Sequence, residues 1–353
     1  MLIARAPVRV SFGGGGTDLE AYYGRYGGMV VSAAINKYFY TMVSPGGEND
    51  GVQIISSDYH TFYRYDPGQP TFWNGNLQLP RAILGHFGLE CGYDLFLSSE
   101  VPPGTGLGSS GSVAVTLVRA LSTLCGVTLS RKEIAETAAH IEIEKMGMPV
   151  GKQDQYAAAF GGLNAITFHT QGVTVEPVSM TKSTLRQLER SLLLFFTGST
   201  RESSKILHHQ KRASEENQEP VINALHTIKV LAQEIRTCLE MGDLDGLGEL
   251  LHRSWGQKKN LAPNITNSFI DHCYDLARRR GALGGKITGA GGGGFLMLYC
   301  PPAHQTAVTR ALEREGLVRM NFQFDFQGAT VLLNTLPSNH SRHGQNLAWA
   351  VSR

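Results

Sequence analysis

Short stretches in which apolar residues alternate with polar ones, or run together, dominate the start of the chain. Segments 4–12, 27–45, 51–58 and 93–102 have this pattern and predict β-strands. Four glycines at 13–16 separate the first two of these segments and predict a turn. We therefore expect the first hundred residues to be rich in strands.

A helical period replaces this pattern after residue 109. In "SGSVAVTLVRALSTLCG" the apolar side chains recur every three or four residues, and the run ends at Gly126, so we expect one helix here. Ser130 and Glu133 have the spacing of a capping box, which predicts a second helix running to about Met146. A loop, a short helix and a strand are expected over 148–168.

The second half of the chain contains a different succession of elements. The apolar segment 191–200 predicts a buried strand, and the polar segment 201–260 predicts helices broken near Pro220 and Gly242. Residues 278–298 then predict a helix, a glycine-rich turn and a strand.

A helix from about His304 to Arg314 and a final pair of strands complete the pattern. Because strands and helices come in groups and do not strictly alternate, the fold class is expected to be α+β. A boundary between two domains is expected within 165–195. The last residues, 341–353, have no clear pattern, and we expect them to be disordered.

The composition is that of an ordinary soluble globular protein, with 42% apolar residues, 18% charged residues and a formal net charge of +2. The basic residues are scattered, so neither nucleic acid nor a membrane surface is indicated as a partner. Five cysteines, none at CxxC spacing, argue against a disulfide framework or a zinc site. The N-terminus lacks a signal-peptide core and no segment approaches a membrane span, so we expect a cytoplasmic protein.

A cluster of glycines and serines stands directly before the first long helix, in "EVPPGTGLGSSGSVAV". A glycine inside a helix costs about 1 kcal/mol relative to alanine, so such a cluster indicates that the backbone itself approaches a ligand, most often an anion. Ser109 and Ser110 offer hydroxyls at the same place, and a hydroxyl beside bound phosphates commonly joins a Mg²⁺ shell. The loop therefore predicts a phosphate site at a helix N-terminus.

Two common phosphate motifs do not explain this loop. Gly106, Gly108 and Gly111 match G-x-G-x-x-G, but the acid about 20 residues later is Glu133, which belongs to the capping box, so the dinucleotide fingerprint is incomplete. Gly285-Lys286 lacks the serine or threonine that a Walker A loop requires. The catalytic and metal-loop motifs of protein kinases are absent as well.

Three motifs together resemble one known family. "PPGTGLGSSGSVAV" is similar to the phosphate-binding motif of the galactokinase, homoserine kinase, mevalonate kinase and phosphomevalonate kinase (GHMP kinase) family. "ARAPVRVSFGGGGTD" and "KITGAGGGGFLM" are similar to the N-terminal and C-terminal motifs of that family, in the same order along the chain. The resemblance implies an ATP-dependent, Mg²⁺-dependent sugar phosphotransferase, with a homodimer left open.

The resemblance also implies the fold and the place of ATP. Residues 1–180 would form an N-terminal domain like domain 2 of ribosomal protein S5, and residues 181–340 a ferredoxin-like C-terminal domain. ATP would lie in the crevice between them. Its phosphates would contact the glycine loop through Pro103, Gly104, Gly106, Leu107, Gly108, Ser109, Ser110 and Gly111.

Roles for individual residues follow from the same match. Asp154 in "GKQDQ" corresponds to the family's catalytic carboxylate, and Arg9 to a basic residue beside it. Glu142 and Ser110 correspond to the side chains that contact Mg²⁺. These roles suit phosphoryl transfer, in which Mg²⁺ neutralises charge, a carboxylate can take the acceptor proton and a guanidinium keeps that carboxylate ionised.

The acceptor sugar would contact the N-terminal turn, the C-terminal glycine motif and nearby cations. The residues predicted to contact the substrate are Gly15, Gly16, Thr17, Asp18, Lys152, Gly289, Gly291 and Arg201. Lys258 and Lys259 are further candidates for binding a phosphate of the acceptor, and the alternative is that they are solvated charges on a helix.

The combination of "GGGGTD", "GKQDQYAAAFGG" and "FFTGSTRESS" most resembles one branch of the family. That branch phosphorylates the anomeric C1 hydroxyl of D-glycero-D-manno-heptose 7-phosphate and gives the 1,7-bisphosphate. Two alternatives remain. One is a kinase of the same fold for fucose, galactose or an octose phosphate, and the other is a non-catalytic sensor that binds sugar and ATP.

Overall fold

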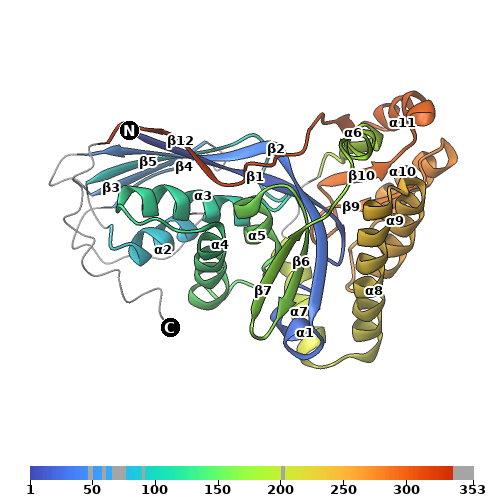
Figure 1. The fold of residues 1–353 in the computed structure, drawn as a ribbon, viewed down its shortest axis with the longest axis horizontal. Helices are drawn as coiled ribbons and strands as arrows, with labels where there is room; N and C mark the ends of the chain where they lie inside the picture. Colours follow the sequence, from blue (N-terminus) through green and yellow to red (C-terminus); the bar gives the residue numbers. More distant parts are fainter. Residues whose placement is uncertain (47–50, 58–60, 66–76, 90–91, 200–202, 337–353) are drawn as a thin grey trace.

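The computed structural model describes residues 1–46, 51–57, 61–65, 77–89, 92–199 and 203–336, which form two β-sheets with helices around them (Figure 1). The predictions for Arg201 and for the tail at 341–353 lie outside these residues. No helix in this part of the chain is long and apolar enough to cross a bilayer.

The first sheet is built almost entirely from the first half of the chain. Its main path runs β12-β1-β2-β5-β3-β4, and β6 and β7 extend it from the far end of β2. All described pairings in it are antiparallel except β3 with β5. The strands are β1 (Leu2–Gly13), β2 (Gly28–Pro45), β3 (Val52–Ser56), β4 (Thr61–Tyr65), β5 (Tyr93–Ser99), β6 (Leu163–His169), β7 (Gly172–Pro177) and β12 (Thr330–Asn334).

A group of helices packs on one face of this sheet. The helix α3 contacts both β1 and β2, and α5 and α4 pack beside it. The helices of the first half are α1 (Glu20–Tyr26), α2 (Gln78–His86), α3 (Ser109–Leu124), α4 (Arg131–His140), the π-helix η1 (Ile141–Lys145) and α5 (Gln153–Phe160). The capping box predicted at Ser130 and Glu133 is confirmed at the start of α4.

The second sheet has the strand order β11-β8-β10-β9, with every pairing antiparallel. Its strands are β8 (Leu192–Phe196), β9 (Gly284–Ile287), β10 (Phe295–Tyr299) and β11 (Val318–Arg319). With helices between β8 and β9 and between β10 and β11, the chain order is β-α-β-β-α-β, which confirms the ferredoxin-like prediction.

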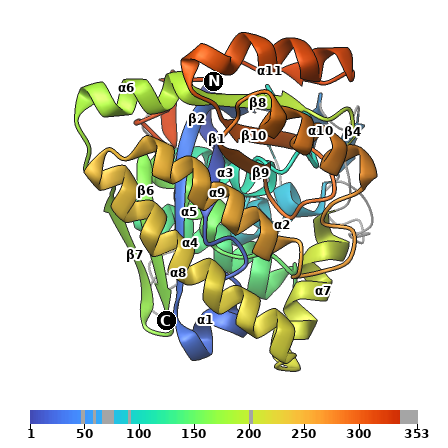
Figure 2. The ribbon, with the colours of Figure 1, turned by 90° about the vertical axis from the view of Figure 1, so that its right-hand side faces the viewer.

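The helices of the second half are α6 (Lys182–Ser191), α7 (Ser203–Glu215), α8 (Glu219–Met241), α9 (Leu244–Lys258), α10 (Ser268–Arg279) and α11 (Pro302–Arg314). The breaks predicted near Pro220 and Gly242 are confirmed, because Pro220 lies in the first turn of α8 and Gly242 caps its end in a left-handed conformation. Figure 2 shows α8 and α9 side by side, running diagonally across the molecule.

One hydrophobic core joins the two sheets. Val10 and Phe12 of β1 are buried in the same cluster as Leu194 of β8 and Ile235 of α8. This explains why β1 is buried at every position from Ala6 to Gly13, since helices of the first half cover one face and α8 covers the other.

The prediction of a final strand pair is wrong, because β11 and β12 do not pair with each other. β11 pairs with β8 in the second sheet, whereas β12 crosses to the edge of the first sheet and pairs with β1. The proposed domain boundary at residue 180 stays a proposal; a division by sheets assigns Thr330–Asn334 to the first unit.

Candidate functional site

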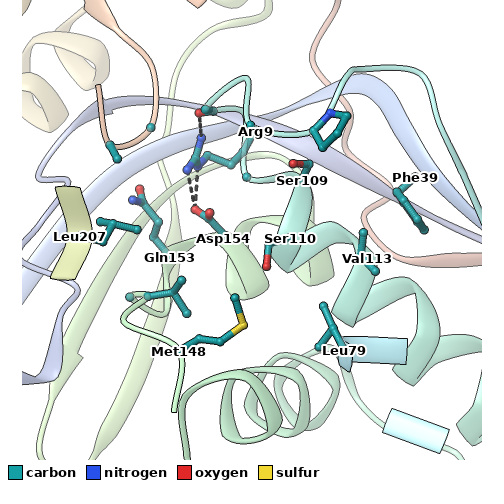
Figure 3. Close-up of a pocket in the computed structure, with 18 of the residues that line it drawn as sticks. Arg9, Phe39, Leu79, Ser109, Ser110, Val113, Met148, Gln153, Asp154 and Leu207 are labelled. Atoms are coloured by element: carbon teal, nitrogen blue, oxygen red, sulfur yellow. Dashed lines mark hydrogen bonds and ion pairs between the residues drawn. The ribbon is translucent and has the colours of Figure 1, made fainter. Parts of the chain in front are cut away.

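A cavity of about 470 Å³ lies where the glycine loop, the N-terminal turn and the second sheet's helices meet. Figure 3 shows apolar side chains at one end, Phe39, Leu79 and Val113, and the side chains of Gln153 and Leu207 at the other. Arg9 and Asp154 lie between the two ends. A site of this shape suits a ligand with an apolar ring at one end and a polar partner at the other.

The glycine loop forms the middle of the cavity wall. It connects β5 to α3, and Gly104, Gly106 and Gly108 all have φ between 74° and 79°. The first residues of α3 are Ser109 and Ser110, whose side chains line the cavity. Backbone N–H groups at a helix N-terminus, with a favourable helix dipole, form a natural phosphate site.

Most of the residues predicted to bind the nucleotide line this cavity. These are Pro103, Gly104, Gly106, Gly108, Ser109 and Ser110. Two do not: Leu107 is fully buried in the core, and Gly111 faces α5. A Cβ on Gly111 would lie 2.6 Å from Cβ of Asp154, so this glycine allows α3 to approach the residue predicted to be catalytic.

The C-terminal glycine motif packs directly on the loop. A Cβ on Gly106 would lie 2.5 Å from the carbonyl oxygen of Thr288, and Thr288 Oγ1 donates a hydrogen bond to the carbonyl of Thr105. Gly289 lines the cavity, as expected for a residue near the substrate. Gly291 is not part of the lining and packs against Ile265, so its predicted substrate contact stays a prediction.

Arg9 and Asp154 form an ion pair in the cavity wall. Two guanidinium nitrogens of Arg9 lie 2.6 and 2.9 Å from Oδ1 of Asp154, and the third donates to the carbonyl of Gly106 at 2.6 Å. Arg9 follows an irregularity in strand pairing between Pro7 and Val8, and such irregularities often direct side chains near functional sites. Arg9 is buried, whereas the side chain of Asp154 is 25% exposed and thus open to a ligand.

The N-terminal turn brings Asp18 close to this pair. Asp18 accepts hydrogen bonds from the backbone N–H groups of Gly16 (2.9 Å) and Gln153 (3.3 Å). Burial raises the pKa of Asp18, and the negative charge of Asp154 adds to this effect, while the backbone donors oppose it. Gly15, Gly16 and Asp18 all line the cavity.

Thr17 has a different position from its neighbours. Its side chain is fully buried, and its hydroxyl bonds the backbone carbonyls of Gly14 and Met29. These bonds join the turn to β2, and Thr17 is not in the cavity lining. Its predicted contact with the substrate stays a prediction, and its hydrogen bonds give a structural reason for a threonine at this position of the turn.

Glu142 and Ser110, predicted together as a metal site, are in direct contact. Ser110 Oγ donates to Oε1 of Glu142, and Gln155 Nε2 donates to Oε2 at 2.6 Å. Burial raises the pKa of Glu142 to about 7, although the hydrogen bonds from Ser110 and Gln155 oppose this shift. Glu142 lies in the π-helix that follows α4, and short π-helices of this kind often occur at functional sites.

The residues present fit Mg²⁺. No cluster of three His, Cys, Asp or Glu side chains suited to a metal occurs in the described part of the chain. Mg²⁺ does not require one, since it is usually held by one or two carboxylates with waters and substrate phosphates. Glu142 and the Ser110 hydroxyl offer hard oxygen ligands beside the predicted phosphate loop.

The predicted cations have three different surroundings. Lys152 lines a second, smaller cavity of about 260 Å³ that shares Asp18 with the first, and its Nζ lies 5.4 Å from the ring centre of Tyr23. Lys259 is 38% exposed and pairs with Asp271 at 3.5 Å. Lys258 is buried and lines the main cavity, so the alternative that it is a solvated helix charge is wrong.

Several lining or supporting residues were not predicted from the sequence. Gln153 and Gln210 line the polar end, Gln155 holds Glu142, and Lys286 is buried near Arg9. Gln153 and Gln155 flank Asp154 in "KQDQ", which was a signal that could have been used. No local signal identifies Gln210 or the apolar end, because only the packing of distant segments brings them to the cavity.

Comparisons with known proteins match the two halves of the chain to two related family models. The model described as "GHMP kinases N terminal domain" matches residues 77–162, and that described as "GHMP kinases C terminal" matches residues 231–318. A D-glycero-alpha-D-manno-heptose 7-phosphate kinase from Campylobacter jejuni is 32% identical over 92% of this chain and 96% of its own length. A mevalonate kinase from Pyrococcus horikoshii is 31% identical over 68% and 69% of the two chains.

Solved structures give the same picture. A D-glycero-D-manno-heptose 1-phosphate kinase from Bacteroides thetaiotaomicron has a TM-score of 0.78 and 28% identity, covering 95% of this chain and all of the other. A galactokinase from Lactococcus lactis, complexed with galactose, has a TM-score of 0.73 over 94% of each chain. At 19% identity, the second comparison shows the fold alone.

Proposed function

The chain belongs to the GHMP kinase family and is an ATP-dependent kinase, and we propose that its acceptor is D-glycero-D-manno-heptose 7-phosphate. The γ-phosphate of ATP would pass to the anomeric C1 hydroxyl and give the 1,7-bisphosphate. The observation that carries the proposal is the Arg9–Asp154 pair beside the glycine loop, in a chain 32% identical to a heptose 7-phosphate kinase across nearly its whole length.

The cavity suggests how the two substrates are arranged. The adenine would occupy the apolar end at Phe39, Leu79 and Val113, and the phosphates would extend along the glycine loop toward Ser110. The sugar would occupy the polar end beside Asp18 and the N-terminal turn. This arrangement leaves the acceptor hydroxyl and the γ-phosphate to meet near Asp154.

Asp154 is the proposed catalytic base. It would accept the proton of the C1 hydroxyl while that oxygen bonds the γ-phosphorus and the bond from phosphorus to the β–γ bridging oxygen breaks, which releases ADP. Arg9 bonds Oδ1 of Asp154 and keeps the carboxylate oriented and ionised. The backbone N–H groups of the loop would stabilise the phosphates.

Glu142 and Ser110 are the proposed ligands of Mg²⁺. When bound, Mg²⁺ neutralises charge that develops on the phosphate oxygens during transfer. Gln155 positions Glu142 by donating to its second carboxylate oxygen. Glu142 therefore presents one fixed oxygen with Ser110 at the start of α3.

A phosphotransfer assay over a panel of acceptors tests the proposal. We expect ATP-dependent phosphorylation of heptose 7-phosphate, with a product whose new phosphate couples to the anomeric proton in ³¹P NMR. The panel includes heptose, heptose 1-phosphate, fucose and galactose, because one similar structure is that of a heptose 1-phosphate kinase. Preferred phosphorylation of the 1-phosphate, or equal kcat/KM for heptose and its 7-phosphate, would contradict the assignment.

A further inference from the structure

Lys258 is a buried lysine at the end of α9, and it lines the main cavity. The residue is 7% exposed, and Nζ donates hydrogen bonds to the carbonyls of Ile287 (3.1 Å) and Gly289. An ammonium group has three N–H donors, so two are used by the glycine motif and one is left for a ligand. The lysine is thus fixed in direction by the backbone it bonds.

The charge around Lys258 is not balanced by the protein. Arg9 pairs with Asp154, but neither Lys258 nor the equally buried Lys286 pairs with a carboxylate among the residues that the structure describes. Burial lowers the pKa of Lys258, and the positive charges of Lys286 and Arg9 lower it further. Buried charges in proteins are normally paired, so the unpaired ammonium group of Lys258 in the cavity wall indicates an anionic ligand.

We propose that Lys258 binds a phosphate oxygen at the centre of the cavity, between the end proposed for ATP and the end proposed for the sugar. Gly289, which accepts a hydrogen bond from Lys258, lies against Gly106 of the glycine loop. Leu261, three residues after Lys258, lines the cavity beside Gly16 of the N-terminal turn. The phosphate is either the one transferred from ATP or the one already on the acceptor. The inference rests on the proposed function, because only a phosphotransferase brings both groups to this place.

The test compares Lys258→Gln with Lys259→Gln. A glutamine at 258 keeps N–H donors for the two carbonyls but removes the charge, and Lys259 is the adjacent, exposed control. Losing a charge-assisted hydrogen bond should cost about 10- to 100-fold in the quantity that depends on it. The readouts are kcat, KM for heptose and for heptose 7-phosphate, and Kd for ADP and for a non-hydrolysable ATP analogue.

The readouts distinguish the two sources of phosphate. A loss in affinity for the ATP analogue but not for ADP, or a loss in kcat alone, assigns Lys258 to the transferred phosphate. A rise in KM for the 7-phosphate without a change for heptose assigns it to the acceptor phosphate. Values equal to those of Lys259→Gln, or equal losses for ADP and heptose, would overturn the inference.

A second variant keeps the test valid if Lys258→Gln does not fold. Lys258→Met replaces an unpaired buried ammonium with an apolar chain of similar length, a change that proteins often tolerate well. It should reproduce the loss seen with glutamine, and Lys258→Arg should retain most activity. If neither neutral variant folds, the hydrogen bonds to Ile287 and Gly289 are a sufficient reason for a lysine at this position, and the inference is wrong.

The proposed function can fail separately from this inference. A wild-type enzyme that does not phosphorylate heptose 7-phosphate would refute the proposed function, while the ATP-analogue measurement would still test Lys258.

Discussion

Arg9 contacts only one carboxylate oxygen of Asp154, so a substitution that keeps this contact can test the catalytic role of Asp154 without disturbing the fold. Arg9 bonds Oδ1, and within the described residues no hydrogen bond to Oδ2 is found. Asp154→Asn keeps the shape and removes the base, so kcat should fall by about 10² or more, since general-base catalysis contributes about 10² to 10⁴. Steady-state kinetics measures the loss, and binding of an ATP analogue should be unchanged.

Asp275→Asn is the matched control, because Asp275 is an exposed residue of α10 that does not line the cavity. Its kcat should equal that of the wild type. If Asp154→Asn retains near-normal kcat while Arg9→Ala does not, the carboxylate only positions Arg9 and the catalytic assignment fails.

Glu142 and Glu144 lie two residues apart in the same π-helix and offer a paired test of the metal site. Glu142 is fully buried against Ser110 and Gln155, whereas Glu144 bonds His140 at the surface. Glu142→Gln should raise the Mg²⁺ concentration needed for half-maximal activity by about 10-fold or more. Glu144→Gln should leave it unchanged. If Glu142→Gln changes only the KM for the sugar, Glu142 is not a ligand of Mg²⁺.

Lys286 predicts a pH dependence of stability in the ligand-free protein. Burial, with the charge of Arg9 nearby, lowers its pKa from 10.5 to about 7. The unfolded chain therefore binds more protons between about pH 7 and 10.5, so the free energy of unfolding should rise with pH across this window. At pH 7 the free energy of unfolding of Lys286→Met should be larger than that of the wild type, and this difference should shrink toward pH 10. Denaturant titrations at several pH values measure this difference; a difference that does not change with pH would show that folding does not lower the pKa of Lys286.

At the scale of elements, the close packing of α3 on α5 positions the proposed base. A Cβ added to Gly111 would lie 2.6 Å from Cβ of Asp154 and 2.9 Å from its backbone carbon, so the two helices would have to separate. We expect Gly111→Ala to cost about 1–3 kcal/mol of stability and to lower kcat, because overpacking shifts the backbone that carries Asp154.

A second helical glycine provides the control for this prediction. Gly256 of α9 has open space around its added Cβ, so Gly256→Ala should raise stability by up to about 1 kcal/mol through helix propensity alone. Thermal unfolding and kcat are measured for both variants. Equal effects at 111 and 256 would mean that contact between α3 and α5 does not determine the position of Asp154.

The elements that could be predicted from the sequence are those specified by local pattern. The period of α3, the cap at Ser130 and the end of α8 at Gly242 all depend on residues close together in the chain. The pairing of the final strands could not be predicted, because it depends on long-range packing. Thr330–Asn334 pairs with β1, more than three hundred residues earlier in the chain. The π-helix at Ile141–Lys145 also follows from packing and has no sequence pattern of its own.

The same reasoning explains which site residues were found. The glycine loop, Arg9 and Asp154 lie in contiguous motifs, and the structure brings them into contact. The sequence alone does not decide whether Lys258 contacts a ligand or is a solvated charge, because its burial depends on contacts with Ile287 and Gly289, about thirty residues away. A polar residue on a helix gives no indication in the sequence of which distant loop will cover it.

At the scale of the whole molecule, one of the buried hydrophobic clusters contains residues of both sheets, which predicts that the two sheets unfold together. Ile235 of α8 is fully buried, and a Cβ on Gly13 of β1 would lie 2.8 Å from its Cδ1, so this side chain packs across the two halves. Ile235→Ala should cost about 2–5 kcal/mol through the cavity it leaves. If the halves form one cooperative unit, hydrogen exchange of the slowest amides should accelerate equally in α3 and in β10. Retained protection in α3 with loss only in β10 would instead show two units that unfold independently, and the continuous core would then be a docking interface between domains.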